Sequence, residues 1–128
     1  MDSTLTGRRV FVTGATGFIG RRLVAALTEA GAEVTALIRS RAGLAALPAG
    51  VRAETGAMEN EAALGRALCG QHILINRAYD VRATAADNLA AFDRLLAAAT
   101  ATEVERVVHV SSIVVYDTWP DHDCTEAS

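Results

Sequence analysis

Three glycines near the start of the chain have the spacing of a phosphate-binding loop. Gly14, Gly17 and Gly20 lie three residues apart, directly after the apolar residues 10–12. Glycine at a strand-to-helix turn lets the backbone turn tightly and approach a ligand closely. The helix that follows would direct its free N–H groups and the positive end of its dipole at an anion. We therefore predict a dinucleotide-binding loop here, with a glycine-rich packing turn as the simpler alternative.

Strands and helices must position this loop, and the hydrophobic pattern predicts an alternation of both. We expect strands at residues 9–13, 34–38, 51–55, 73–76 and 106–111, and helices at residues 18–30, 43–47, 60–68 and 85–100. The strand segments are almost continuously apolar, which is typical of a parallel sheet covered on both faces. We therefore expect an α/β fold in which residues 1–128 form one domain. Its core would be a doubly wound, three-layer parallel Rossmann sheet of strand order 3-2-1-4-5.

Composition and charge argue against several other classes of function. The net charge is only −3 and no long basic run occurs, which disfavours nucleic acid or an anionic membrane as a partner. The first residues lack the pattern of a signal peptide, and no apolar run approaches the roughly 20 residues of a membrane span. Cys69 and Cys124 match no metal-binding spacing, and the three histidines fall on separate segments. We therefore expect a cytoplasmic protein with unpaired thiols and no metal site.

Three segments, taken together, match the pattern of a known family. Residues 12–20 read Val-Thr-Gly-Ala-Thr-Gly-Phe-Ile-Gly, residues 70–78 read Gly-Gln-His-Ile-Leu-Ile-Asn-Arg-Ala, and residues 111–116 read Ser-Ser-Ile-Val-Val-Tyr. They resemble the phosphate loop, the fourth strand and the fifth strand of the extended short-chain dehydrogenases/reductases, the NAD-dependent epimerase/dehydratase family. The resemblance runs from residue 8 to residue 126 and implies NADP or NAD as the cofactor.

The resemblance also implies cofactor-binding roles outside the glycine triplet. It places Ala78 beside the nicotinamide ribose and Asn88 in the helix after the fourth strand. At Ala57 and Met58 the chain departs from the family, which has an acid there near the adenine, so one hydrogen bond to the adenine would be lost. The complete set of expected cofactor-binding residues is Gly14, Thr16, Gly17, Phe18, Ile19, Gly20, Arg39, Ala57, Met58, Ala78 and Asn88.

Arg39 bears on which dinucleotide is bound. It stands at the end of the second expected strand, where an acidic residue would bind the ribose 2′-hydroxyl of NAD(H). An arginine there suits the 2′-phosphate of NADP(H) instead. We therefore expect NADP(H) to be preferred over NAD(H). The alternative is that Arg39 and Arg41 are simply solvated loop residues.

The catalytic residues that the resemblance implies are largely missing from the sequence. In the family, a tyrosine transfers the proton, a lysine four residues later lowers its pKa, and a serine, here Ser112, orients the substrate oxygen. The chain contains no lysine, and no Tyr-x-x-x-Arg follows Ser112. We therefore expect a truncated chain without a substrate domain. By itself it would not catalyse the family's reaction on a sugar nucleotide or a related carbonyl or alcohol.

Two other functions stay open at this point. The chain could be a non-catalytic module that senses a dinucleotide or scaffolds a partner, or it could be one half of a split enzyme. The fifth expected strand, apolar at residues 107–110, would also leave an open sheet edge in a chain of this length. An open apolar edge favours association. We therefore expect a homodimer or a complementary chain at this edge.

Overall fold

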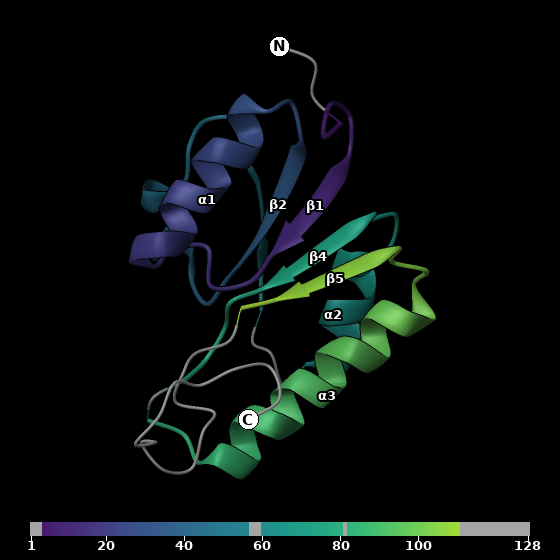
Figure 1. Ribbon diagram of the computed structural model, residues 1–128. Helices are drawn as coiled ribbons and strands as arrows, with labels where there is room; N and C mark the ends of the chain where they lie inside the picture. The colour runs from purple at the N-terminus through teal and green to yellow at the C-terminus, as the bar shows by residue number, and fades with distance from the viewer. Residues whose placement is uncertain (1–3, 57–59, 81, 111–128) are drawn as a thin grey trace, which may run out of the picture.

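The chain folds around one parallel β-sheet, shown in Figure 1. The computed structural model describes residues 4–56, 60–80 and 82–110. The strands pair in the order β3-β2-β1-β4-β5, and every neighbouring pair is parallel. This confirms the expected α/β fold and strand order. The five strands are β1 (Arg9–Val12), β2 (Glu33–Ile38), β3 (Arg52–Thr55), β4 (Ile73–Asn76) and β5 (Arg106–His109).

Helices cover both faces of this sheet and complete the three layers. Helix α1 (Phe18–Glu29) lies on one face, while α2 (Glu61–Leu68) and α3 (Ala85–Ala101) lie together on the other (Figure 1). Side chains alternate between the two faces of a strand, so the sheet divides the core in two. On β1, Val10 and Val12 pack with the α1 side, whereas Phe11 packs with the α2 and α3 side.

Capping residues mark the ends of several helices, and one helix differs in type from the expected one. The Asn60 side chain caps α2 by accepting a hydrogen bond from the Ala63 N–H. Gly31 and Gly70 follow helices with φ of 91° and 82°, the left-handed conformation that glycine adopts freely. The short helix expected at residues 43–47 is instead a 3₁₀ helix, η1 (Arg41–Ala46). Strand β4 has the expected bounds, and the other elements differ from theirs by one or two residues within the described ranges.

Strand β5 differs from the other strands in its exposure. Val107 and Val108 in β5 are 39% and 43% exposed, and Val110 just after it is 45% exposed, whereas the apolar residues of β1 are fully buried. Within the described ranges, β5 pairs only with β4. Association of a second chain at this edge stays a prediction. None of the helices that the structure describes is long and apolar enough to span a bilayer.

Candidate functional site

A cleft of about 910 Å³ opens at the carboxyl ends of β1, β2 and β4. Strands β2 and β4 flank β1, and the strand order reverses there. Open parallel sheets bind their ligands at such a point, beyond the carboxyl ends of the strands. Of the residues predicted from the sequence, six line this cleft: Gly14, Thr16, Gly17, Arg39, Ala78 and Asn88.

The three glycines of the loop between β1 and α1 have different tasks. Gly14 has a φ of 66°, and a Cβ atom there would lie 3.0 Å from the backbone carbon of Arg77. A Cβ on Gly20 would stand 2.1 Å from the Gly14 carbonyl oxygen, a distance that no side chain tolerates. Gly17 is more open, since its Cβ would meet nothing closer than 3.6 Å. Gly14 and Gly20 therefore shape the loop. Gly17 leaves the surface of the loop without a side chain, so a ligand can approach the backbone.

The amino end of α1 provides an anion site next to this loop. Gly17 is the N-cap, so no side chain caps the first turn, and that turn contains no acidic residue. Its N–H groups and the positive end of the helix dipole are therefore left for a ligand. The side chains of Phe18 and Ile19 are 67% and 57% exposed and do not line the cleft. Only the backbone of these two residues is placed to serve the predicted site.

A buried polar network joins the end of β1 to the end of β4. The Thr13 hydroxyl donates to Asn76 Oδ1 at 2.6 Å and accepts from the N–H groups of Arg77 and Ala78 at 3.0 and 3.1 Å. Thr13 and Asn76 are almost completely buried. Asn76 Nδ2 in turn donates to His109 Nδ1 at 3.1 Å. The network fixes the start of the loop after β4, including Ala78, which was expected beside the nicotinamide ribose.

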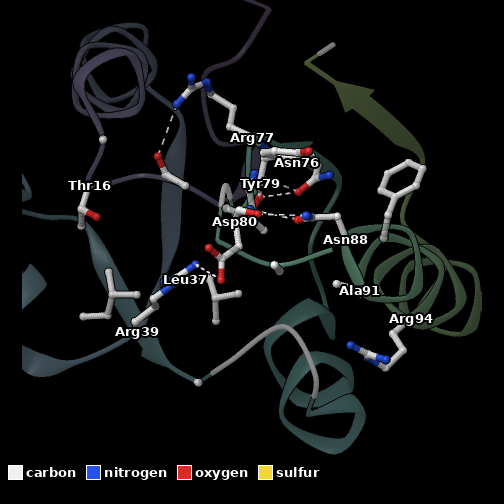
Figure 2. A pocket seen from close by; sticks show the side chains of 18 of the residues that line it. Thr16, Leu37, Arg39, Asn76, Arg77, Tyr79, Asp80, Asn88, Ala91 and Arg94 are labelled. Carbon is white, nitrogen blue, oxygen red and sulfur yellow. Dashed lines mark hydrogen bonds and ion pairs between the residues drawn. The ribbon is translucent and has the colours of Figure 1, made fainter. Parts of the chain in front are cut away.

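Asn88 holds the same loop farther along. Its Oδ1 accepts from the Asp80 N–H, and its Nδ2 donates to the Asp80 carbonyl, both at 2.9 Å. Asn88 also lines the cleft, so the residue expected from the resemblance both faces the site and positions the loop. As Figure 2 shows, this loop brings the Asp80 carboxylate toward Arg39.

Arg39 lies at the cleft, as the sequence predicts, but it faces an acidic residue that sequence reasoning missed. Its Nη2 is 3.9 Å from Asp80 Oδ2, and the Arg39 side chain is 71% exposed. An exposed ion pair of this length is worth only about 0.2–1 kcal/mol. The pair therefore keeps Arg39 near the cleft without holding it firmly.

Some of the predicted residues fall outside the part of the chain that the structure describes. These are Ala57 and Met58, expected near the adenine, and Ser112, expected at the substrate. Residues that sequence reasoning missed are Thr13, Asn76, Arg77 and Asp80. The sequence marks them only weakly, because each is simply a polar or charged residue at the carboxyl end of a strand or a few positions after it. In the described ranges, no three His, Cys, Asp or Glu residues gather as a metal site.

Comparison with known proteins agrees with this geometry. Residues 14–126 match the model of a family described as NAD(P)H-binding. The chain belongs to this NAD(P)H-binding family. The expected kinship with the short-chain dehydrogenases/reductases is also confirmed, because a protein of that superfamily that is 30% identical is among its structural relatives. The chain is thus an NAD(P)-binding domain of an oxidoreductase-type family.

Three relatives illustrate the range of this family. A ketoreductase of 4-hydroxy-2-methyl-3-oxo-4-farnesyl-3,4-dihydroquinoline-1-oxide from Stigmatella aurantiaca is 34% identical over 84% of this chain and 34% of its own length. A short-chain dehydrogenase/reductase superfamily protein from Agrobacterium tumefaciens, solved with bound NAD, is 30% identical, with a TM-score of 0.69 over 82% of this chain and 33% of that one.

The third relative was solved with NADPH rather than NAD. The NADPH-dependent quinone oxidoreductase QOR2 from Escherichia coli, solved with NADPH, is 26% identical, with a TM-score of 0.68 over 78% of this chain and 35% of that one. The chain therefore spans about a third of the length of these relatives. NAD and NADPH are both bound by proteins that share its fold.

Proposed function

We propose that this chain is the cofactor-binding part of an NADP(H)-dependent oxidoreductase that acts on a carbonyl or alcohol. The observation that carries the proposal is the cleft at the strand-order reversal, with a glycine loop and an uncapped helix terminus on its wall. The ketoreductase and quinone oxidoreductase relatives support a carbonyl substrate. A sugar nucleotide is the substrate class that the epimerase/dehydratase resemblance favours.

Each wall of the cleft would have a distinct task. The nicotinamide, when bound, supplies or takes the hydride. The backbone of the Gly14–Gly20 loop binds the pyrophosphate, because its N–H groups have no capping side chain. The loop after β4 supports the nicotinamide ribose through Ala78, whose N–H is held by Thr13.

Arg39 is the residue that favours NADP(H) in this proposal. The end of β2 carries this arginine and no acid that would bind a ribose 2′-hydroxyl. Asp80 is its present partner, at a distance typical of a weak pair. A 2′-phosphate offers a guanidinium a stronger, bidentate contact, so the phosphate displaces the carboxylate.

Turnover is expected to need more than residues 1–128. These residues include no lysine to lower the pKa of a tyrosine, and the described part of the cleft holds no Tyr-Lys pair. We therefore propose that they bind a dinucleotide without reducing or oxidising a substrate. The same observation favours a second candidate function, a dinucleotide-binding sensor or scaffold, or one half of a split enzyme.

Cofactor preference is tested by titrating NADPH and NADH into the chain and into Arg39→Ala. We expect tighter binding of NADPH to the wild type, and a loss in Arg39→Ala that is much larger for NADPH than for NADH. Arg41→Ala is the matched control, because Arg41 belongs to the same segment but does not line the cleft. A wild type that prefers NADH, or an equal loss for both nucleotides, would contradict the proposed preference.

Catalysis is tested separately on the purified chain. We expect no NADPH oxidation above background when ketones or quinones are added at saturating NADPH. General acid–base catalysis contributes typically about 10² to 10⁴ in rate, and its loss leaves little activity. Rapid oxidation by the pure chain would show that another of its residues does the proton transfer.

A further inference from the structure

Arg77 is the one cationic side chain in the described part of the cleft that lies against the glycine loop. It is the first residue after β4, and Thr13 holds its N–H. Gly14 lacks a Cβ at the point where one would press on the Arg77 backbone, so the loop after β4 lies directly against the glycine loop. In Figure 2 the Arg77 side chain extends toward the segment before α1.

The guanidinium lies on the surface of the loop where a pyrophosphate is expected. Its Nη1 donates to the Gly14 carbonyl at 3.4 Å, the upper limit for a hydrogen bond. The same nitrogen lies 4.0 Å from the position of a Cβ on Gly17. The charge is therefore placed beside the uncapped start of α1, next to N–H groups that also need an acceptor.

The hydrogen bonding of Arg77 is incomplete in the structure. Its Nε is buried and has no hydrogen-bond partner. Ion pairs among the described residues join Arg8 to Glu105, and both Arg39 and Arg82 to Asp80, but none includes Arg77. Buried polar groups are normally satisfied, so an unsatisfied Nε beside a half-buried charge calls for an anionic acceptor.

We propose, on the basis of the dinucleotide-binding function above, that Arg77 binds the pyrophosphate of the dinucleotide. The guanidinium gives up its long bond to Gly14 and donates to phosphate oxygens from the β4 side. The α1 N–H groups donate from the other side. The pyrophosphate is thus held between a side chain and a helix terminus. Arg77 contributes equally to NADH and NADPH, because both share this group, whereas Arg39 distinguishes them.

The test compares Arg77→Gln with the wild type in titrations with NADPH, NADH and ADP-ribose. ADP-ribose carries the pyrophosphate without the nicotinamide. We expect a loss of affinity of about 10- to 100-fold, similar for all three ligands, as for a lost hydrogen bond between charged groups. Arg77→Lys keeps the charge and should recover part of the loss. Arg52→Gln, at the opposite end of the sheet, removes the same net charge and should change affinity less than twofold.

The possible outcomes are distinct. Binding of all three ligands to Arg77→Gln within twofold of the wild type would overturn the role of Arg77 and leave the proposed function intact. Tighter binding by Arg77→Gln would overturn it too, because the side chain would then block the phosphate site. A wild type that binds none of the ligands would overturn both proposals. Thermal unfolding of each variant separates a lost contact from a lost fold, and Arg77→Lys supplies the test if Arg77→Gln does not fold.

Discussion

The loop before α1 and the loop after β4 face the same cleft, but they are built by different means. The first takes its shape from glycines, because Gly14 and Gly20 stand where a Cβ would collide with backbone. The second takes its shape from side-chain hydrogen bonds, given by Thr13, Asn76 and Asn88. A ligand between them would thus contact bare backbone on one side and side chains on the other.

This difference separates the binding of a phosphate group from the selection between NADH and NADPH. Backbone N–H groups and a helix dipole bind a phosphate whatever the rest of the ligand is. The loop after β4 carries Arg77 and Asp80, and Asp80 faces Arg39 across the cleft. Substitutions on the glycine side should therefore weaken the binding of all dinucleotides alike. Those around Asp80 should change which ligand is preferred.

The largest effect is expected for Gly20→Ala. Its new Cβ would stand 2.1 Å from the Gly14 carbonyl oxygen and 3.0 Å from the Ala15 backbone, which leaves little room to relax. We expect a loss of about 3 kcal/mol in the free energy of unfolding, the upper end for an overpacked site. Urea denaturation measures this loss. Gly65→Ala on α2, where a Cβ meets nothing within 4 Å, should instead gain about 0.5–1 kcal/mol. Equal effects of the two substitutions would contradict this account of the loop.

Next in size is Thr13→Val, which removes the hydroxyl that organises the other side. The N–H groups of Arg77 and Ala78 would lose their shared acceptor, and Asn76 Oδ1 would lose a donor. We expect about 1–2 kcal/mol of destabilisation, because the Arg77 N–H loses its acceptor, whereas the Ala78 N–H keeps its bond to Asn76 Oδ1 at 3.3 Å. Thr28→Val is the control, since its hydroxyl donates only to the Val24 carbonyl within α1. If both variants unfold at the same urea concentration, the network does not hold the loop.

A smaller effect, on ligand preference alone, is expected for Asp80→Asn. The substitution frees Arg39 from its carboxylate partner and removes a negative charge beside the expected 2′-phosphate. NADPH should bind about two- to fivefold more tightly, in line with an exposed pair worth about 0.2–1 kcal/mol, while NADH binding stays unchanged. Asp87→Asn, which alters an acid on the same cleft, is the control. The gain should disappear in an Arg39→Ala background; a gain that persists there would refute the coupling.

The smallest effect is expected away from both loops, at Glu105. The hydrogen bond and charge of Arg8 lower the pKa of Glu105 below its ordinary value of 4.5. Because the folded pKa is lower than the unfolded one, the stabilisation is present above about pH 4.5 and is lost as the pH falls through the folded pKa. Glu105→Gln should therefore lower the Tm slightly at pH 7, by an amount that shrinks as the pH falls below about 4.5, with no change in dinucleotide affinity. An altered affinity would mean that the far end of the sheet influences the cleft.

The same contrast explains what could be predicted from the sequence. The glycine loop was predictable because a tight turn and a close approach of backbone require glycine. Arg39 was predictable because the residue at the end of the second strand is the one expected to meet the ribose 2′ group. The strand order followed from the alternation of apolar strands and helices. Thr13 and Asn76 were missed because their pairing depends on two strand ends 63 residues apart lying side by side.

Arg77 and Asp80 were harder still to predict from the sequence. An arginine after a strand is more often solvated, and only the approach of the loop after β4 to Gly14 places Arg77 on the phosphate side. The position of Asp80 depends on two hydrogen bonds with Asn88: the Asp80 N–H donates to Asn88 Oδ1, and Asn88 Nδ2 donates to the Asp80 carbonyl. Nothing in the sequence marks this helix residue as a partner of Asp80. Side-chain direction, set by tertiary contacts, was the missing information.

The central claim is that the glycine loop binds the pyrophosphate, and Gly17→Asp tests it most directly. Gly17 has a φ of −73°, and a Cβ there meets nothing within 3.5 Å, so the substitution leaves the fold intact while adding a carboxylate at the expected phosphate position. Isothermal titration of NADPH should show saturable binding to the wild type and none to Gly17→Asp, whose unfolding temperature should be no lower than that of the wild type because Asp is a favoured N-cap residue. Unchanged NADPH binding by Gly17→Asp would contradict the account.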